Sequence, residues 1–381
     1  MIEPGSQADV RFAARLVIEG VVPEDRVRAA LAKQKELAER GKPLAIADMV
    51  VRLRWMTAAE SALLTDPDHP PSDLLPGLEL GPRIGEGGMS RVYRGVDLST
   101  RTPLAVKILS PRLRREETAR ARFRAEGELL CRLEHEHLVK GFYFHEHDGL
   151  DYLAMELVEG TTALERLDGA GVLSEDAALD VVLKTAKALD YMASEGLVHR
   201  DVKPGNVLLG ASGEVKLCDL GLTALAEAVS EGGDVTCGTA QYLAPEQAAG
   251  AAGLDARADI YALGVTLFQL VLGKLPFDGV ADEESMRRRM TEELRAKELK
   301  GLRVSQHLHY FIHKMTARER EVRYASHAEL ISDIEESTAG RDRLASPKVD
   351  RRPTPASGRF NVAGAAAAPG AMRRPLFRRS P

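Results

Sequence analysis

The stretch VHRDVKPGNVLL, residues 198–209, places three polar side chains of different chemistry between apolar flanks. Asp201, Lys203 and Asn206 supply a carboxylate, an ammonium and a carboxamide. The apolar residues on either side indicate that the loop is anchored in a core, so the three side chains are held close together. Such a set suits the positioning and charge compensation of a charged reactant.

The bulk properties of the chain indicate an intracellular globular protein. Its 381 residues are too many for one ordinary core, so we expect two or three folded units. Three cysteines without metal-site or redox-pair spacing favour a reducing compartment. No apolar run approaches the roughly 20 residues of a membrane span, and the N-terminus lacks a signal-peptide pattern. The sequence therefore predicts a cytoplasmic protein without a membrane span.

Charge is distributed unevenly along the chain. From Arg341 onward there are ten Lys or Arg against two Asp, among many Pro, Ala and Gly residues. This composition predicts a disordered basic tail over 339–381. Because the net charge is -5, the rest of the chain is acidic, and we expect no nucleic-acid partner.

The pattern of apolar residues changes twice before residue 80. EDRVRAALAKQKELAERG and a loosely related run about 34 residues later predict a helical module over 1–66. Prolines mark 67–77 as a linker. Short runs rich in β-branched residues follow, and the chain is mostly helical after residue 174. We therefore expect an α+β fold over 78–338, with a small antiparallel sheet lobe and a larger helical lobe.

Two features of the predicted sheet point to an anionic ligand. IGEGGMSRVY contains Gly85, Gly87 and Gly88 ahead of Val92, and backbone N–H groups freed in this way suit phosphate oxygens. A glycine-rich hairpin that is only a turn is the alternative. Lys107 stands in the middle of the apolar strand LAVKIL, where a buried ammonium needs an anionic partner. On an edge strand it would instead extend to water.

Two carboxylates complete the set. Glu126, on the helix that follows, is the expected partner of the strand lysine; Glu128 competes, but the apolar stripe of Phe123 and Leu130 favours Glu126. KLCDLGL ends a strand with Asp219 beside a flexible turn, a setting that suits coordination of Mg²⁺.

Taken in order, the glycine-rich loop, strand Lys, helix Glu, HRDVKPGN, DLG and GTAQYLAPE resemble the signature set of eukaryotic-type protein kinases. GEGGMSRVY and GTAQYLAPEQ are most similar to the bacterial eukaryotic-like Ser/Thr kinases. The resemblance covers about 78–338. It implies a bilobal kinase fold and an ATP-dependent protein Ser/Thr kinase with Mg²⁺ as cofactor and Mn²⁺ as its substitute. The implied substrates are proteins, including the kinase itself, in cytosolic signalling.

The resemblance also implies roles for the polar residues. Asp201 would accept or orient the proton of the substrate hydroxyl, and Lys203 would neutralise charge on the transferred γ-phosphoryl group. Lys107, steadied by Glu126, would contact the α- and β-phosphates. The implied metal ligands are Asn206 and Asp219.

An ATP pocket follows from the same resemblance. Met155 would be the gatekeeper at its rear. The residues implied to contact adenine are Val92, Ala105, Leu208 and the backbone of Glu156 and Val158. The residues implied to cover the phosphates are Ile84, Gly85, Glu86, Gly87, Gly88, Met89 and Ser90.

Regulation is implied by Arg200, because an Arg beside the catalytic Asp is a feature of kinases switched by activation-loop phosphorylation. Thr236 is the favoured acceptor of that phosphate, with Thr223 and Ser230 as alternatives. Thr239 is expected to bond both Asp201 and Lys203, as in Ser/Thr kinases. The implied structural residues are Asp259, capping the catalytic-loop backbone, and Glu246, paired with Arg323.

Few positions depart from the family pattern. Ser90 replaces the third glycine of the loop, and Leu220 replaces the Phe that commonly follows Asp219. Neither change removes a catalytic group, so we expect an active enzyme. The alternative is a pseudokinase scaffold that presents the N-terminal module to a partner.

Residues 11–34, RFAARLVIEGVVPEDRVRAALAKQ, are similar to a repeat in the N-terminal domains of secretion and pilus assembly ATPases. Some relatives with this repeat bind cyclic di-GMP. Here Ala13 replaces a glycine of the pattern, and Arg54 stands where the first repeat has Gly20. We therefore expect a helical module that binds a protein partner, with dinucleotide binding as the alternative.

Overall fold

The computed structural model describes residues 6–220, 241–250, 253–276 and 304–345. The chain divides into two compact units, Met1–Thr338 and Ala339–Pro381. Within the described ranges, no helix combines the length and the hydrophobicity that crossing a bilayer requires.

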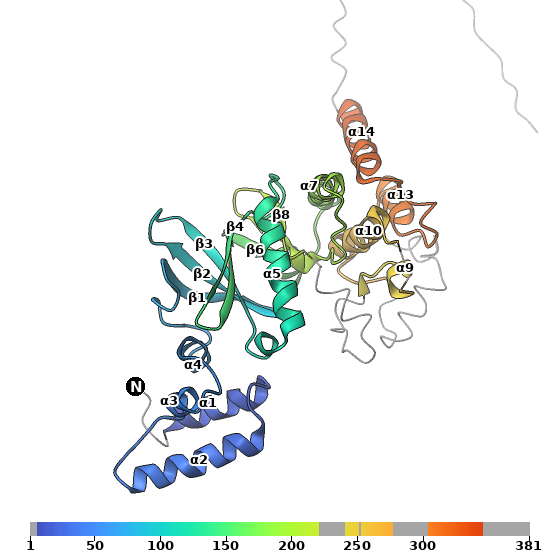
Figure 1. Cartoon of the computed structure of the whole chain (residues 1–381). Coiled ribbons are helices and arrows are strands. Elements are labelled where there is room, and N and C mark those ends of the chain that lie inside the picture. The colour runs from blue at the N-terminus through green and yellow to red at the C-terminus, as the bar shows by residue number, and fades with distance from the viewer. Residues whose placement is uncertain (1–5, 221–240, 251–252, 277–303, 346–381) are drawn as a thin grey trace, which may run out of the picture. The chain divides into compact units, whose positions relative to one another are not determined.

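The N-terminal helices form two related pairs, shown in blue in Figure 1. Their bounds are α1 Gln7–Ile18, α2 Glu24–Glu39, α3 Ile46–Arg52 and α4 Ala58–Thr65. After α1 the chain turns at Gly20 with φ +62°, and after α3 it turns at Arg54 with φ +57°. Val21 N–H donates to the Leu16 carbonyl and Trp55 N–H to the Val50 carbonyl, both at 2.9 Å. The second repeat therefore keeps the left-handed turn although Arg replaces glycine, at a backbone cost that neighbouring contacts must offset.

A five-stranded antiparallel sheet follows, in the order β1-β2-β3-β5-β4. The strands are β1 Leu78–Glu86, β2 Ser90–Asp97, β3 Pro103–Leu109, β4 Gly141–His147 and β5 Leu150–Glu156. A short 3₁₀ turn, η1 Leu113–Arg115, leads into α5 Glu117–Arg132, which lies against the sheet beside β4 (Figure 1).

The two faces of this sheet are covered differently. On one face, Phe123 and Leu130 of α5 join the main core together with Leu153. On the other face, Leu63 of α4 joins a separate core that includes Ile108 of β3. Segment 67–77 contains no helix or strand, but it packs closely, with Leu75 buried and the Tyr93 hydroxyl donating to the Pro67 carbonyl at 3.0 Å. α4 and this segment thus serve as part of the small lobe.

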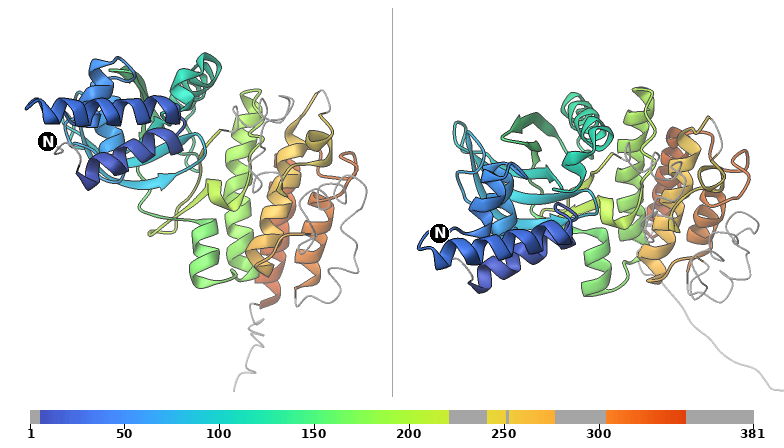
Figure 2. Two further views of the ribbon diagram at one scale, coloured as in Figure 1. Left: turned by 90° about the horizontal axis from the view of Figure 1, so that it is seen from below. Right: turned by 60° about the horizontal axis from the view of Figure 1, so that its bottom comes forward.

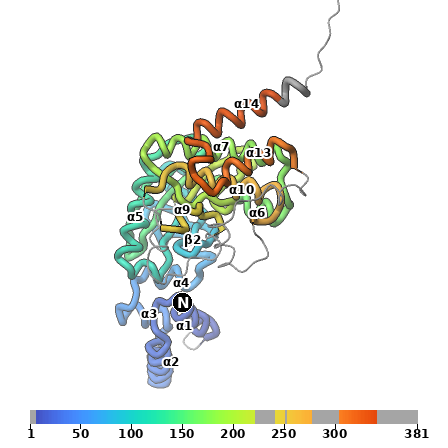
Figure 3. The backbone as a smooth tube through the Cα atoms, turned by 90° about the vertical axis from the view of Figure 1, so that its right-hand side faces the viewer, coloured from blue at the N-terminus to red at the C-terminus, as the bar shows by residue number. Residues whose placement is uncertain are grey.

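The second lobe is mainly helical, as the further views in Figures 2 and 3 show. α10 Ala256–Leu272 is buried on nearly all sides and contacts α7 Glu175–Ser194 and α13 Gln306–Met315. The remaining helices are α6 Ala163–Ala170, α9 Pro245–Ala248 and α14 His327–Ala345. The stretch 198–209 contains η2 Pro204–Asn206 and continues directly into β7 Val207–Gly210. This strand lies between β6 Gly160–Thr162, which precedes the stretch in the chain, and β8 Val215–Leu217, which follows it, in a three-stranded sheet. The predicted α+β class, with a sheet lobe and a helical lobe, is confirmed.

Candidate active site

Lys107 lies in the central strand β3, where its neighbour in β2 is Val92. Its ammonium is 2.9 Å from Glu126 Oε1 and 2.8 Å from Asp219 Oδ1. Glu128 is exposed on the other side of α5. The structure thus places Glu126, rather than Glu128, against the lysine. β3 is the middle strand of the sheet and Lys107 is buried, so the lysine does not extend to water as it would on an edge strand. The two carboxylates compensate its charge instead.

Burial and charge act against each other in this triad. Burial by itself would lower the pKa of Lys107, but the carboxylates of Asp219 and Glu126 outweigh it, and the pKa is raised. For Glu126 burial dominates and raises its pKa, with Lys107 offsetting only part of the effect. Burial also tends to raise the pKa of Asp219, but Lys107 lowers it overall. The lysine is therefore held as a cation at the meeting point of the two lobes.

The Asp201 carboxylate has two unequal oxygens. Oδ2 accepts hydrogen bonds from Lys203 Nζ and Asn206 Nδ2, both at 2.8 Å. Asn206 Nδ2 also donates to the Asp201 carbonyl at 2.8 Å. Oδ1 is buried and has no hydrogen-bond partner among the described residues. A buried carboxylate oxygen without a donor is unfavourable, so Oδ1 retains an unused capacity to accept a hydrogen bond.

The loop backbone is held by a buried carboxylate from α10. Asp259 accepts from the N–H of His199 at 2.8 Å and from the N–H of Arg200 at 2.7 Å. Arg200 has φ +71° and Asp219 has φ +58°, so two residues of the site adopt the left-handed conformation that side chains disfavour. The capping by Asp259 supplies the contacts that keep Arg200 in this conformation.

His199 and Gln247 are site residues to which the sequence analysis gave no role. His199 is 1% exposed, its Nδ1 lies 3.3 Å from the Asp201 N–H, and its Nε2 lies 3.3 Å from the Cys218 carbonyl. An Nε2–H tautomer therefore links the catalytic loop to the residue before Asp219. Gln247 Nε2 donates to the Arg200 carbonyl at 3.3 Å. The available signals were the position of His199 inside HRD and the position of Gln247 at the end of GTAQYLAPEQ.

The residues expected to contact ATP gather around the β1–β2 hairpin and β3. Gly87 N–H donates to the Ser90 carbonyl at 2.9 Å, and Ser110 N–H donates to the Met89 carbonyl at 2.8 Å, which fixes the base of the hairpin. Gly85 lies opposite Val92 in the pairing of β1 and β2, and Gly88 lies in the turn between these strands. Ile84 is 45% exposed. Ala105 and Met155 are buried, whereas Val92 and Leu208 are partly buried.

The end of β5 and the residues that follow it, whose backbone is expected to contact adenine, are anchored from both lobes. Glu156 N–H donates to the Lys140 carbonyl at 2.8 Å, and its carboxylate is 2.9 Å from Lys216 Nζ. Val158 packs partly buried against the main core. Thr223, Ser230, Thr236 and Thr239 lie outside the described residues, so the structure does not place them.

Glu246 and Arg323 form a two-point ion pair, with N–O distances of 2.6 and 2.9 Å. The Arg323 side chain has no exposed surface, and its guanidinium lies over the Tyr261 ring at 4.9 Å. It also donates to three carbonyl oxygens, those of Ala317, Arg257 and Arg318. This arginine therefore joins α9, α10 and the segment before α14.

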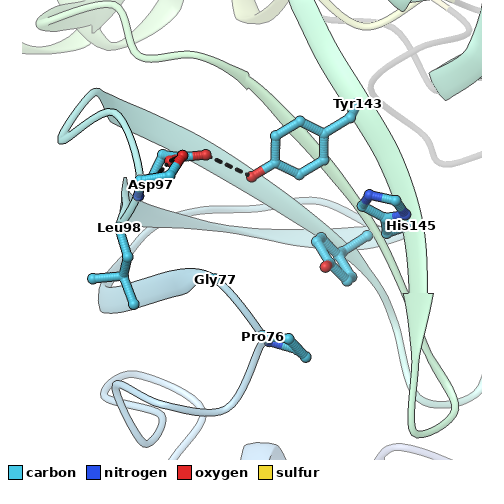
Figure 4. Close-up of a pocket in the computed structure, with 8 residues that line it drawn as sticks. Pro76, Gly77, Asp97, Leu98, Tyr143 and His145 are labelled. Carbon is cyan, nitrogen blue, oxygen red and sulfur yellow. Dashed lines mark hydrogen bonds between the residues drawn. The ribbon is translucent and has the colours of Figure 1, made fainter.

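A surface pocket of the small lobe lies apart from these residues (Figure 4). It is lined by Asp97, Tyr143 and His145 among others, and the Tyr143 hydroxyl points toward Asp97 Oδ2 at 3.5 Å. Burial raises the pKa of Tyr143 to about 12. None of the residues with expected catalytic roles lines this pocket.

Comparison with known proteins assigns residues 78–333 to a described protein family. The family model described as "Protein kinase domain" matches residues 78–333. The chain is 33% identical over 258 residues to a probable serine/threonine-protein kinase PknB of Lactococcus lactis, covering 67% of this chain and 41% of that protein. It is 33% identical over 274 residues to the serine/threonine-protein kinase PknB of Mycobacterium tuberculosis, covering 69% and 43%. The chain thus spans about two fifths of the length of these relatives.

Solved structures show the same architecture. The crystal structure of Rad53 residues 1–466 in complex with AMP-PNP superposes with a TM-score of 0.56 at 25% sequence identity. The match covers 68% of this chain and 64% of that one. The N-terminal helices lie outside the residues matched by the family model.

Proposed function

Because this chain belongs to the protein kinase family, we propose that it is a serine/threonine kinase that transfers the γ-phosphoryl group of ATP to hydroxyls of proteins. The asymmetric Asp201 carboxylate carries this proposal. Lys203 and Asn206 hold one oxygen in place, and the other is buried without a partner among the described residues. A substrate hydroxyl that donates to the free oxygen would be oriented for attack, and Asp201 would accept its proton.

The residues present fit Mg²⁺ and a triphosphate. Asn206 and Asp219 offer oxygen ligands, and Mg²⁺ is typically held by one or two protein ligands together with phosphates and water. When bound, the ion neutralises charge on the phosphate oxygens; Mn²⁺ would substitute for it. Lys107, kept charged by its two carboxylates, would contact the α- and β-phosphates, and Lys203 would face the transferred group.

Arg200 would bind the phosphate that is added to the activation loop. Its Nε is buried without a hydrogen-bond partner among the described residues. A phosphate on Thr236 adds about -1.5 to -2 charge, which would pair with this guanidinium and order the segment. We expect phosphopeptide mapping of the autophosphorylated chain to find Thr236 occupied; modification of Thr223 or Ser230 alone would contradict this assignment.

The N-terminal helices would bind a protein partner, and the enzyme would act in the cytosol on protein substrates. Residues 1–66 would be the interaction module, 78–338 the catalytic domain and 339–381 a basic tail, with 67–77 joining the first two. The left-handed turns at Gly20 and Arg54 support an origin by duplication of a helix pair, as in the ATPase N-terminal repeats.

The proposal is tested by incubating the full chain with γ-labelled ATP, Mg²⁺ and dephosphorylated casein. We expect label on phosphoserine and phosphothreonine of casein and of the chain itself. A chain that binds ATP but transfers no label to either protein would favour the pseudokinase alternative.

Replacing the strand lysine tests the ATP site directly. Lys107→Met is expected to weaken ATP binding by about tenfold to a hundredfold, the scale of one lost charge-assisted hydrogen bond. Isothermal titration with Mg²⁺-ATP measures the effect. Lys33→Met, which removes a half-exposed lysine paired with Glu36, is the matched control and should leave the affinity unchanged. Equal affinities of the Lys107 variant and the wild type would contradict the assignment.

A further inference from the structure

An ion-pair bridge links the N-terminal helices to the glycine-rich hairpin. Arg91, the second residue of β2, donates from Nε to Glu86 Oε1 at 3.1 Å and from Nη2 to Glu19 Oε1. Glu86 is the residue opposite Arg91 in the pairing of β1 and β2, whereas Glu19 follows α1. The side chains of Arg91 and Glu19 are 8% and 19% exposed, whereas that of Glu86 is 47% exposed. The pair of Arg91 with Glu19 is therefore the one that is shielded from solvent, unlike most surface pairs.

The bridge acts on the back of the strand that forms the nucleotide site. Neighbouring residues of a strand point to opposite faces, so Arg91 and Val92 lie on opposite sides of β2. Val92 is paired with Lys107, while Arg91 is paired with Ile108, which packs in the core that contains α4. The N-terminal helices therefore hold the outer face of a hairpin whose inner face meets the ligand.

A second contact holds the entrance to α5. Arg115 in η1 donates to the Val21 carbonyl and, at 2.6 Å, to the Trp55 carbonyl. These carbonyls follow the two left-handed residues, Gly20 and Arg54, and thus occupy equivalent places in the two repeats. The Arg115 guanidinium thus donates hydrogen bonds to both turns. Its bond to the second turn is one of the contacts that offset the backbone strain of the left-handed Arg54. α5 carries Glu126, the partner of the site lysine.

We propose that the N-terminal helices are a positioning clamp for the nucleotide site, with Glu19 and Arg91 as its positioning residues. This inference rests on the proposed kinase function. The clamp fixes the hairpin at Arg91 and the start of α5 at Arg115. The glycine-rich hairpin is therefore already ordered when ATP binds. Ordering a loop on binding lowers affinity, and a preorganised loop avoids that loss. A partner that bound residues 1–66 would then change ATP affinity without touching the site.

The test uses the full chain and Glu19→Ala, which removes the acceptor of the Arg91 hydrogen bond. We expect the Kd for Mg²⁺-ATP, measured by titration calorimetry, to rise about threefold to tenfold, with kcat nearly unchanged, because a preorganising contact is lost while the reacting groups remain. Amide exchange across residues 82–92 should become faster without nucleotide. Glu24→Ala, which breaks the exposed pair of Glu24 with Arg28 on α2, is the matched control and should match wild type in both measurements.

Arg91→Met removes the other end of the bridge. Methionine has a similar length but no N–H donor, so it bonds neither Glu86 nor Glu19, and this variant should raise the Kd at least as much as Glu19→Ala. The double variant should bind Mg²⁺-ATP no more weakly than Arg91→Met alone, since both substitutions remove the same bridge. Glu19→Ala with wild-type Kd and wild-type exchange would overturn the proposal, as would fully additive effects in the double variant.

The outcomes distinguish the clamp from the kinase function. The exchange of residues 82–92 in the absence of nucleotide reports on the clamp even if the chain phosphorylates nothing. Conversely, unchanged exchange in a chain that phosphorylates casein would overturn the clamp alone.

Discussion

Asp201→Asn is expected to bind Mg²⁺-ATP with wild-type affinity and to lose phosphoryl transfer by at least about 10²-fold, the typical contribution of a general base. The amide is nearly isosteric. Its oxygen can still accept from Lys203 and Asn206, which hold Oδ2 in the structure. Its NH₂ group then takes the place of Oδ1, the buried oxygen without a partner among the described residues. A donor at that place cannot accept the substrate proton, so the loss falls on kcat.

The measurement is kcat for casein phosphorylation, together with calorimetric titration of Mg²⁺-ATP. Asp180→Asn on α7, which removes one exposed carboxylate paired with Lys184, is the matched control and should retain full activity. Normal turnover by the Asp201 variant would refute the role given to this carboxylate.

Arg323→Ala is expected to lower the free energy of unfolding by about 3–5 kcal/mol, the typical effect of breaking a buried ion pair by removing one partner. The change leaves the Glu246 carboxylate without its two-point partner and three carbonyls without their donor. Urea unfolding followed by circular dichroism measures the change. Arg320→Ala, whose side chain is 36% exposed, is the control and should shift the free energy by less than about 0.5 kcal/mol.

A double variant sharpens this prediction. Arg323→Met with Glu246→Gln removes both charges, and a pair replaced in this way is often nearly neutral. Here the three carbonyls remain without the arginine, so only part of the lost stability should return. Full recovery would show that the ion pair alone explains the effect, and a loss below about 1 kcal/mol in Arg323→Ala would contradict the assignment of this residue as a structural link.

Much of the candidate site could be predicted from the sequence because its chemistry is encoded in short, regular patterns. A short apolar run rich in β-branched residues placed Lys107 inside a strand, and the apolar stripe of the next helix favoured Glu126 over Glu128, which the contacts in the structure bear out. The comparisons confirm the kinase family over 78–333. The binding and regulatory roles of individual residues stay predictions, as do the partner and the ligand of residues 1–66.

Local patterns could not supply the contacts made by residues without a distinctive neighbourhood. Gln247 ends the motif GTAQYLAPEQ, but the motif does not show that its side chain bonds the Arg200 carbonyl, 47 positions away in the chain. The prolines of segment 67–77 predicted a linker, but they gave no sign that Leu75 is buried. That burial depends on the sheet against which the segment packs. Arg54 was interpreted as the loss of a glycine, yet the turn persists because Arg115 bonds the carbonyl that follows it.

The sequence by itself determined which chemical groups this protein has, their order, and the helices and strands that carry them, since spacing and propensity act over a few residues. Only the tertiary structure decided that Lys107 and Asp219, 112 positions apart, meet at 2.8 Å, and that Glu19 reaches the hairpin through Arg91. Contacts of this kind depend on how faces pack after distant segments are brought together, and no local pattern specifies that packing.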